Sequence, residues 1–283
     1  MLGEDRHNYE YDVDLEGPTA PARVVRLVGK KKKVLEIGAG PGSITKHLVE
    51  SGGCTVTALE IDEDAIKKLG QYADKIYPAD LNDVNWPELL EEDGPFEVIV
   101  AGDVLEHLYD PWVTLELMKG LLTDDGYIVI SLPHVGHNAI CACLLNEDFD
   151  YRDWGLLDRT HIRFFGLKNI QSMFEGAGLV IAHAEFVVTP PEETEFAETW
   201  NKLPRSVRSA LSENRFGSVY QVVIKAEPDT RKGNKVDLLS LPVELPTLSS
   251  VSALRALAVR YLPDGIKTLL KRLLKTIKRK KEW

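Results

Sequence analysis

Short apolar runs alternate along the chain with segments in which apolar residues recur at helical spacing. The runs predict strands at 33–37, 55–60, 75–78, 96–101 and 126–132. The segments between them predict helices near 42–50, 63–71, 86–92 and 111–122, after a first helix within TAPARVVRLVG. Regular alternation of strands and helices is typical of a doubly wound, mostly parallel α/β sheet.

This alternation stops after Pro133. Residues 134–165 are rich in His, Asp, Arg and aromatic side chains and are too long for a simple connection, so we expect a functional insert. A helix at 168–177 and a strand at 179–188 follow. A second insert, 189–216, leads to the strand SVYQVVIKAE, and we expect these last two strands, with no helix between them, to form an antiparallel hairpin at the sheet edge.

The pattern divides the chain into four parts. We expect an N-terminal extension and helix (1–30), an α/β domain (31–227), a proline-containing linker (228–250) and a tail (251–283). In the tail, apolar residues recur at helical spacing (Ile266, Leu269, Leu270, Leu273, Leu274, Ile277) and lysines line another face. The tail therefore predicts a basic amphipathic helix that lies on an anionic membrane, docks on the acidic body or binds a partner.

Charge separates the tail from the rest of the chain. Of the 283 residues, 44% are hydrophobic and 28% charged, which is typical of a globular protein, and the net charge is −10. Residues 255–283 carry ten Lys or Arg against two acidic residues, a local charge of +8, which leaves −18 for the preceding 254. So acidic a body disfavours a nucleic-acid partner.

Three cysteines and an N-terminus without the apolar core of a signal peptide favour a reducing compartment. We expect a cytoplasmic protein, peripheral on the inner face of the membrane if its tail binds lipid.

The stretch KVLEIGAGPG is the strongest chemical signal in the sequence. It joins a buried strand to a helix through Gly38, Gly40 and Gly42, and glycine lets the backbone approach a ligand closely, as in a nucleotide cradle. Its spacing is G-x-G-x-G, which differs from the G-x-G-x-x-G of dinucleotide enzymes. Glu36 at the strand end would repel a phosphate and suit a cationic ligand.

Polar residues stand at the ends of the next strands, at the edge where ligands bind in such sheets. Glu60 can accept two hydrogen bonds from a ribose diol, and Ile61 can pack on an adenine face. Asp80, followed by Leu81, can accept from an exocyclic amine, and Asp103 follows the fourth strand. We expect these residues to line one site.

VLEIGAGPGSITKHL, ALEID, PADLND and AGDVLEHLYDP occur in the order and spacing of class I S-adenosylmethionine-dependent methyltransferases, which the chain resembles over residues 30–226. The resemblance implies a seven-stranded sheet that binds S-adenosylmethionine. It places the three glycines beside the methionine part, Glu60 on the ribose, and Asp80 with Leu81 on the adenine. SLPHVGH and GLLDRTHIRFFGLKNIQSMFEGAGL further resemble methyltransferases of surface-glycan gene sets and, more distantly, ubiquinone-pathway O-methyltransferases.

Asp103-x-x-Glu106-His107 is similar to the E-x-x-E-H of small-RNA terminal 2′-O-methyltransferases and ubiquinone-pathway enzymes, which holds a divalent ion. The resemblance implies Mg²⁺ or Mn²⁺ bound by Asp103, Glu106, His107 and His161, although Asp103 has a shorter side chain than the family's Glu. In a metal-free alternative His107 or His161 is the general base. In a third, Glu106 and His107 only order the loop.

The first insert supplies candidates for the acceptor site: Asp158, Arg159, Thr160, Trp154, Phe164 and Phe165. The aromatic residues can stack on a sugar or an aromatic acceptor, and core packing is the alternative for the two phenylalanines. An Arg159–Asp158 salt bridge is the structural alternative for that pair. His134 and His137 flank the same edge, and we expect loop histidines there to be solvated.

Together these features predict a methyltransferase that methylates a sugar hydroxyl on a glycan or lipid-linked saccharide. A small aromatic or quinone-like acceptor is the alternative substrate. An NAD-type oxidoreductase is disfavoured by G-x-G-x-G and Asp80. A noncatalytic adenosylmethionine-binding protein is disfavoured by the intact Glu106, His107 and His161.

Overall fold

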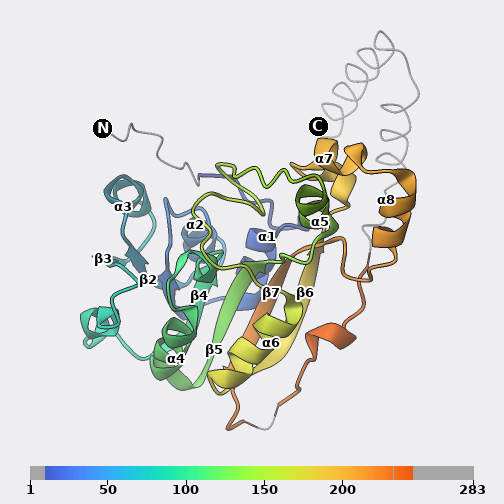
Figure 1. Cartoon of the computed structure of the whole chain (residues 1–283). Coiled ribbons are helices and arrows are strands. Elements are labelled where there is room, and N and C mark those ends of the chain that lie inside the picture. Colours follow the sequence, from blue (N-terminus) through green and yellow to red (C-terminus); the bar gives the residue numbers. More distant parts are fainter. Residues whose placement is uncertain (1–9, 232, 245–283) are drawn as a thin grey trace, which may run out of the picture. The chain divides into compact units, whose positions relative to one another are not determined.

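A seven-stranded sheet, in the order β3-β2-β1-β4-β5-β7-β6, organises the computed structural model, which describes residues 10–231 and 233–244 (Figure 1). The strands are β1 (Lys33–Ile37), β2 (Thr55–Glu60), β3 (Lys75–Pro78), β4 (Phe96–Gly102), β5 (Leu122–Pro133), β6 (Leu179–Val188) and β7 (Val219–Pro228). β1 to β5 pair in parallel, and β7 is antiparallel to both of its neighbours. The predicted doubly wound, mostly parallel seven-stranded sheet is confirmed.

Helices cover both faces of the sheet because successive strand residues point to opposite sides. Val98 and Val100 of β4 join one core with the N-terminal helices α1 (Ala20–Val28) and α2 (Thr45–Glu50). Ile99 and Ala101 join the other core, with α4 (Pro111–Gly120) and α6 (Leu167–Gly176). Figure 1 shows α4 and α6 in front of the sheet and α1 behind it.

Local signals explain where several helices begin. Asp62 caps α3 (Glu63–Leu69) by accepting hydrogen bonds from the backbone nitrogens of Asp64 and Ala65. Asp110 caps α4 through the backbone nitrogen of Val113, and Pro111 occupies the first helical position. The segment predicted as a helix at 86–92 is a 3₁₀ helix, Trp86–Leu90.

Both inserts contain helices that the sequence analysis did not predict. The first holds α5 (Asn138–Leu145), and the second holds α7 (Ala197–Lys202) and α8 (Arg205–Ser212). The expectation of no helix between the last two strands is therefore wrong. Those strands do pair antiparallel, but β7 inserts between β5 and β6, so β6 forms the sheet edge. This placement buries Val222, Val223 and Ile224 of β7 completely.

The segment predicted as a linker instead packs on the domain up to the end of its described part. Leu238 is fully buried in the core, and its backbone nitrogen donates to Oε1 of Gln171 on α6 at 3.2 Å. The Val236 nitrogen donates to the Ile181 carbonyl of β6 at 2.8 Å. The apolar residues between the prolines explain this packing, because they complete the core beside α6.

The predicted amphipathic helix of the tail lies in 245–283, outside the described residues, and stays a prediction. Within 10–231 and 233–244, none of the helices has the length and apolar character needed to span a bilayer.

Candidate active site

The carboxyl ends of the parallel strands bring the glycine stretch and Glu60 together. Glu60 Oε2 accepts a hydrogen bond from the Gly40 nitrogen at 2.6 Å. Its Oε1 accepts from the nitrogens of Ile61 and Asp62 at 2.8 and 2.9 Å. The Glu60 carboxylate thus ties the loop after β1 to the end of β2, and a ribose diol bound there would share these oxygens with the backbone.

Backbone geometry explains why glycines follow β1. Gly38 and Gly40 have φ angles of 61° and 56°, a left-handed region that other residues adopt at a cost. A Cβ on Gly38 would lie 2.8 Å from a methyl of Val104, whereas a Cβ on Gly40 would meet nothing within 4 Å. Gly38 is required for packing, while the space above Gly40 is available to a ligand.

Glu36 lies beneath this loop rather than on its surface. It is 2% exposed, and its Oε2 accepts a hydrogen bond from the Thr45 hydroxyl at 2.6 Å. Burial, opposed by the Thr45 hydrogen bond and aided by the charge of Glu60, raises the pKa of Glu36 to about 7. The carboxyl group therefore changes charge near neutral pH.

The residues predicted to contact the adenine lie along the same edge of the sheet. Ile61 is 63% exposed directly after Glu60, so its side chain is available to a flat ring. The Ala79 nitrogen donates to the Glu60 carbonyl at 3.1 Å, which brings the end of β3 beside the end of β2. Asp80 follows, exposed, and its Oδ1 accepts from the backbone and side-chain nitrogens of Asn82. Leu81 packs partly against the core.

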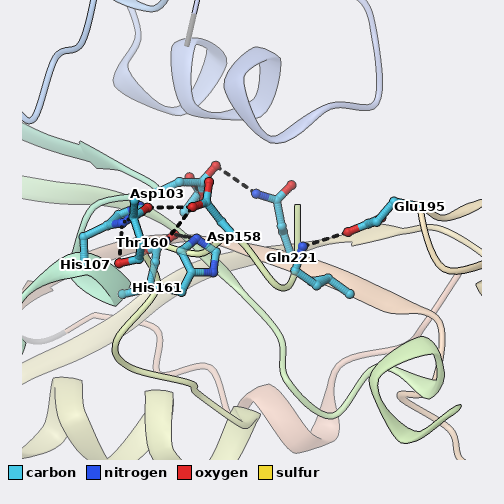
Figure 2. A network of polar contacts seen from close by, with 10 residues as sticks. Asp103, His107, Asp158, Thr160, His161, Glu195 and Gln221 are labelled. Atoms are coloured by element: carbon cyan, nitrogen blue, oxygen red, sulfur yellow. Dashed lines mark hydrogen bonds and ion pairs between the residues drawn. The ribbon is translucent and has the colours of Figure 1, made fainter. Parts of the chain in front are cut away.

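Asp103, after β4, is fixed by two residues that the sequence analysis did not identify. Its φ of 54° is left-handed. The Ser131 hydroxyl donates to Oδ1 at 2.8 Å. The Gln221 side chain donates to Oδ2, also at 2.8 Å (Figure 2). Burial, only partly offset by these two hydrogen bonds, raises the pKa of Asp103. Ser131 and Gln221 belong to β5 and β7, and their polar character near strand ends was the available signal.

Glu106, His107 and His161 form a group that we call the histidine–glutamate cluster, in which Glu106 is buried and His107 half-buried. Their ligand atoms all lie within 4.8 Å of one another, and Asp103 is outside the group. The two imidazoles meet edge to face with centroids 4.8 Å apart. Nε2 of His161 is 3.8 Å from Oε1 of Glu106, which is longer than a hydrogen bond. The structure thus brings together three of the four predicted metal ligands.

The Glu106 carboxyl group has an unusual environment. It is fully buried, and within the described part of the chain neither oxygen has a hydrogen-bond partner. Burial, together with the negative charges of Asp103 and Asp158, raises the pKa of Glu106 well above its usual value. A buried carboxyl group without a partner is costly, and a bound cation removes that cost.

The two histidines are held by the LDRTH stretch of the first insert. Nδ1 of His107 lies 3.0 Å from the Thr160 hydroxyl, which donates to Oδ1 of Asp158 at 2.6 Å (Figure 2). The backbone nitrogens of Ile162 and Arg163 donate to the Glu106 carbonyl at 3.0 Å. Burial, with a smaller contribution from His107, lowers the pKa of His161 to about 4, so this imidazole is neutral at pH 7.

The other residues predicted for the acceptor site differ in their surroundings. The guanidinium of Arg159 pairs with Asp153 at 2.9 Å. Phe165 is 3% exposed in the core, whereas Trp154 is 61% exposed.

His134 and His137 are buried rather than solvated, because backbone carbonyls satisfy their rings. Nδ1 of His134 contacts the Val219 carbonyl at 3.0 Å, and Nε2 of His137 contacts that of Thr189 at 2.8 Å. Burial lowers the pKa of His137 to about 4.

The sequence profile of a family described as a methyltransferase domain matches residues 11–184, more than half of the chain. The chain belongs to this methyltransferase family. Its sheet order and the glycine loop beside Glu60 agree with this membership, and S-adenosylmethionine is the donor that the family implies. Membership favours this donor over a nicotinamide cofactor.

Three comparisons place the methyltransferase among known proteins. It is 28% identical over 106 residues to the ubiquinone biosynthesis O-methyltransferase of Glaesserella parasuis, covering 35% of this chain and 44% of that protein. It is 38% identical over 102 residues to the ribosomal RNA small subunit methyltransferase A of Novosphingobium aromaticivorans, covering 32% and 36%. The chain thus spans less than half the length of either relative.

A solved SAM-dependent methyltransferase of Thermotoga maritima superposes with a TM-score of 0.50 at 14% identity, covering 73% of this chain and 86% of that one. This likeness shows the shared fold.

Proposed function

We propose that the protein transfers the methyl group of S-adenosylmethionine to an acceptor hydroxyl, which the histidine–glutamate cluster activates. The observation that carries this proposal is the fully buried Glu106 carboxyl group, which lacks a hydrogen-bond partner among the described residues and faces two imidazoles. Such a group is expensive to keep unless it serves a ligand or a reaction.

The donor would bind across the edge formed by Gly40, Glu60 and Asp80. The sulfonium methyl is already electrophilic, so the protein has two tasks: to align it with the acceptor oxygen and to remove a proton. Burial disfavours the negative charge of Glu36 and Asp103 when no cation is near. A positive sulfonium bound beside them would favour the ionised carboxylates and would be attracted by them.

The chemistry of the cluster favours a divalent ion over a general base. A histidine with a pKa of about 4 is neutral at pH 7 but is a weak proton acceptor, so His161 suits metal ligation better than proton abstraction. Two imidazoles and one carboxylate fit Mn²⁺ better than Mg²⁺, which prefers oxygen ligands. Glu106, His107 and His161 would hold the ion, which when bound lowers the pKa of a neighbouring hydroxyl.

An aromatic diol of the quinol type is the acceptor that we favour. The similarity to the ubiquinone biosynthesis O-methyltransferase of Glaesserella parasuis supports this choice. The resemblance of the sequence motifs to ubiquinone-pathway enzymes supports it as well. A sugar hydroxyl on a glycan or lipid-linked saccharide is the second candidate. Its support is Trp154, which is 61% exposed in the acceptor insert and offers a face on which sugars stack.

Labelled S-adenosylmethionine tests this proposal with the full chain after treatment with a chelator. We expect methyl transfer to an alkylcatechol to be lost in chelator and restored by Mn²⁺ more strongly than by Mg²⁺. Glu106→Gln should remove the response to metal, and Glu92→Gln, an exposed carboxylate elsewhere, should keep it. Full activity in chelator would favour the general-base alternative, and transfer to alkyl glucosides alone would favour the sugar acceptor.

A further inference from the structure

Three aromatic side chains of the first insert form a continuous row that begins at His161. We call Phe164, Phe149 and Tyr151 the aromatic row. The ring centroids of His161 and Phe164 are 6.4 Å apart, those of Phe164 and Phe149 6.2 Å, and those of Phe149 and Tyr151 5.4 Å. Each contact is edge to face, with interplanar angles of 72°, 71° and 79°, so the rings hold one another in place.

Core packing accounts for only one member of this row, Phe149, which packs against a buried cluster of the inserts. Phe164 and Tyr151 are 38% and 54% exposed, whereas Phe165, the next residue in the chain, is 3% exposed in the main core. Phe164 and Tyr151 therefore present apolar ring surface to solvent beside the histidine–glutamate cluster. Contiguous exposed apolar surface at a functional site is typical of a ligand-binding groove.

The charges of the insert make a charged ligand a poor fit for this surface. Asp148 pairs with Lys202 at 3.7 Å, and Asp150 pairs with Arg152 at 3.6 Å. The guanidinium of Arg152 also stacks on Phe196, with its central carbon 4.9 Å from the ring centroid. Because opposite charges compensate one another around the row, its chemistry is that of an apolar surface.

The position of the row relates it to the acceptor. His161 contacts both His107 and Phe164, so the row starts at the group that would hold the reacting hydroxyl. One catechol or sugar ring would contact its first member only. We infer that the aromatic row binds an extended apolar substituent of the acceptor, such as an alkyl or prenyl chain. This inference rests on the proposed function, since it takes the histidine–glutamate cluster as the site of the hydroxyl.

Binding of acceptors with graded chain length tests this inference without requiring turnover. The probes are 4-methyl-, 4-butyl- and 4-octylcatechol and the matching alkyl β-glucosides, below their micelle concentrations. Calorimetry would measure the Kd of each probe for the full chain in the presence of S-adenosylhomocysteine, which has no methyl group to transfer. We expect octyl to bind at least about tenfold more tightly than methyl in one series, because a longer chain buries more apolar surface. The series that shows the effect identifies the head group.

Variants then locate the effect. Tyr151→Ala, which truncates an exposed ring, should reduce the octyl-to-methyl ratio of Kd values about threefold or more. Phe149→Ala should do the same, and Tyr151→Ala keeps the test valid if the half-buried Phe149 variant does not fold. Leu89→Ala, an exposed apolar residue of Trp86–Leu90, should leave the ratio unchanged.

The outcomes separate the two proposals. Chain-dependent binding that Tyr151→Ala abolishes, but without methyl transfer, would support the row and overturn the proposed function. Methyl transfer with no dependence of Kd on chain length would overturn the row and leave the proposed function intact. A chain-length effect that persists in Tyr151→Ala and Phe149→Ala also overturns the inference, because the chain then binds elsewhere.

Discussion

Gln221 and Asp103 lie 118 residues apart in the chain, yet the Gln221 amide nitrogen donates to Oδ2 of Asp103 at 2.8 Å. The Ser131 hydroxyl holds the other carboxylate oxygen at 2.8 Å. The backbone of Asp103 is left-handed, and the two contacts from β5 and β7 hold its side chain in place. The antiparallel strand β7 thus contributes directly to the site edge that the parallel strands form.

Replacing Gln221 should therefore disturb Asp103. In Gln221→Leu, Oδ2 loses its donor, and we expect the free energy of unfolding to fall by about 1–3 kcal/mol. Urea denaturation measures this loss, and calorimetry should show weaker S-adenosylmethionine binding. Gln71→Leu, at an exposed position, is the matched control. A Gln221→Leu protein with wild-type stability and donor affinity would show that this hydrogen bond does not position Asp103.

The pKa of about 7 at Glu36 predicts a stability that depends on pH. The folded protein binds this proton more tightly than the unfolded chain, whose value is 4.5, so the contribution is complete below pH 4.5. This contribution of the protonated Glu36 to the free energy of unfolding, about 3 kcal/mol in total, is lost as the pH rises to about 7. Compared with wild type, Glu36→Gln should gain about this much stability between pH 4.5 and pH 8.

Chemical denaturation of both proteins at several pH values measures the difference between their free energies of unfolding. The effects of the other titrating groups are the same in both proteins and cancel in this difference. A constant difference across this range would contradict the raised pKa. A cationic donor should also favour the ionised Glu36. Binding of S-adenosylmethionine to wild type should then release a proton near pH 6.5, and Glu36→Gln should release less.

The sequence predicted the strands and the glycine turn after β1 well because their signals are local. The run Val34–Ile37 is buried on both faces, and Gly38 and Gly40 need their positive φ angles whatever surrounds them. Where a polar residue ends a parallel strand, as Glu60 ends β2, the fold places it at the carboxyl edge of the sheet without further information.

What the sequence analysis missed depends on distant contacts. Gln221 meets Asp103 only because β7 inserts beside β5, and no local pattern encodes that pairing. Helices α7 and α8 were missed for a different reason: they are only six and eight residues long, and α8 is mostly polar and buries none of its residues. His137 was expected to be solvated because its carbonyl partner, Thr189, belongs to the other insert.

Glu60 should influence both donor binding and the glycine loop. In Glu60→Gln the side-chain NH₂ faces a backbone N–H, either that of Gly40 or those of Ile61 and Asp62. We expect S-adenosylmethionine binding to weaken by about 1–3 kcal/mol, because the ribose hydroxyls and the loop lose a charged acceptor. Calorimetry on a folded variant measures this, with Glu63→Gln on exposed α3 as the control. Unchanged affinity would show that Glu60 does not contribute to donor binding. Tighter binding of NAD than of S-adenosylmethionine would contradict the proposed donor site as a whole.

The histidines of the cluster should affect turnover rather than donor binding. His161→Gln keeps a polar side chain but removes a ligand or base, so we expect methyl transfer to fall by about 10²–10⁴-fold. His107→Ala should behave similarly, while donor affinity stays close to wild type in both. His183→Gln, a half-exposed histidine paired with Glu185 at 3.2 Å, should retain full activity. If His161→Gln turns over at the wild-type rate, the cluster only orders the loop.

The basic tail should attach the protein to anionic lipid. Its apolar row would enter the lipid boundary while the lysines meet head groups, each contributing about 1 kcal/mol, so attachment should weaken as salt rises. The acidic body, which carries −18 before residue 255, would be repelled by the same surface, and this repulsion favours binding through the tail alone. The full chain should sediment with anionic vesicles at low salt, and deletion of 251–283 should abolish this. Neutral vesicles are the control for apolar contact. A full chain that stays in the supernatant even at low salt would leave docking or a protein partner as the role of the tail.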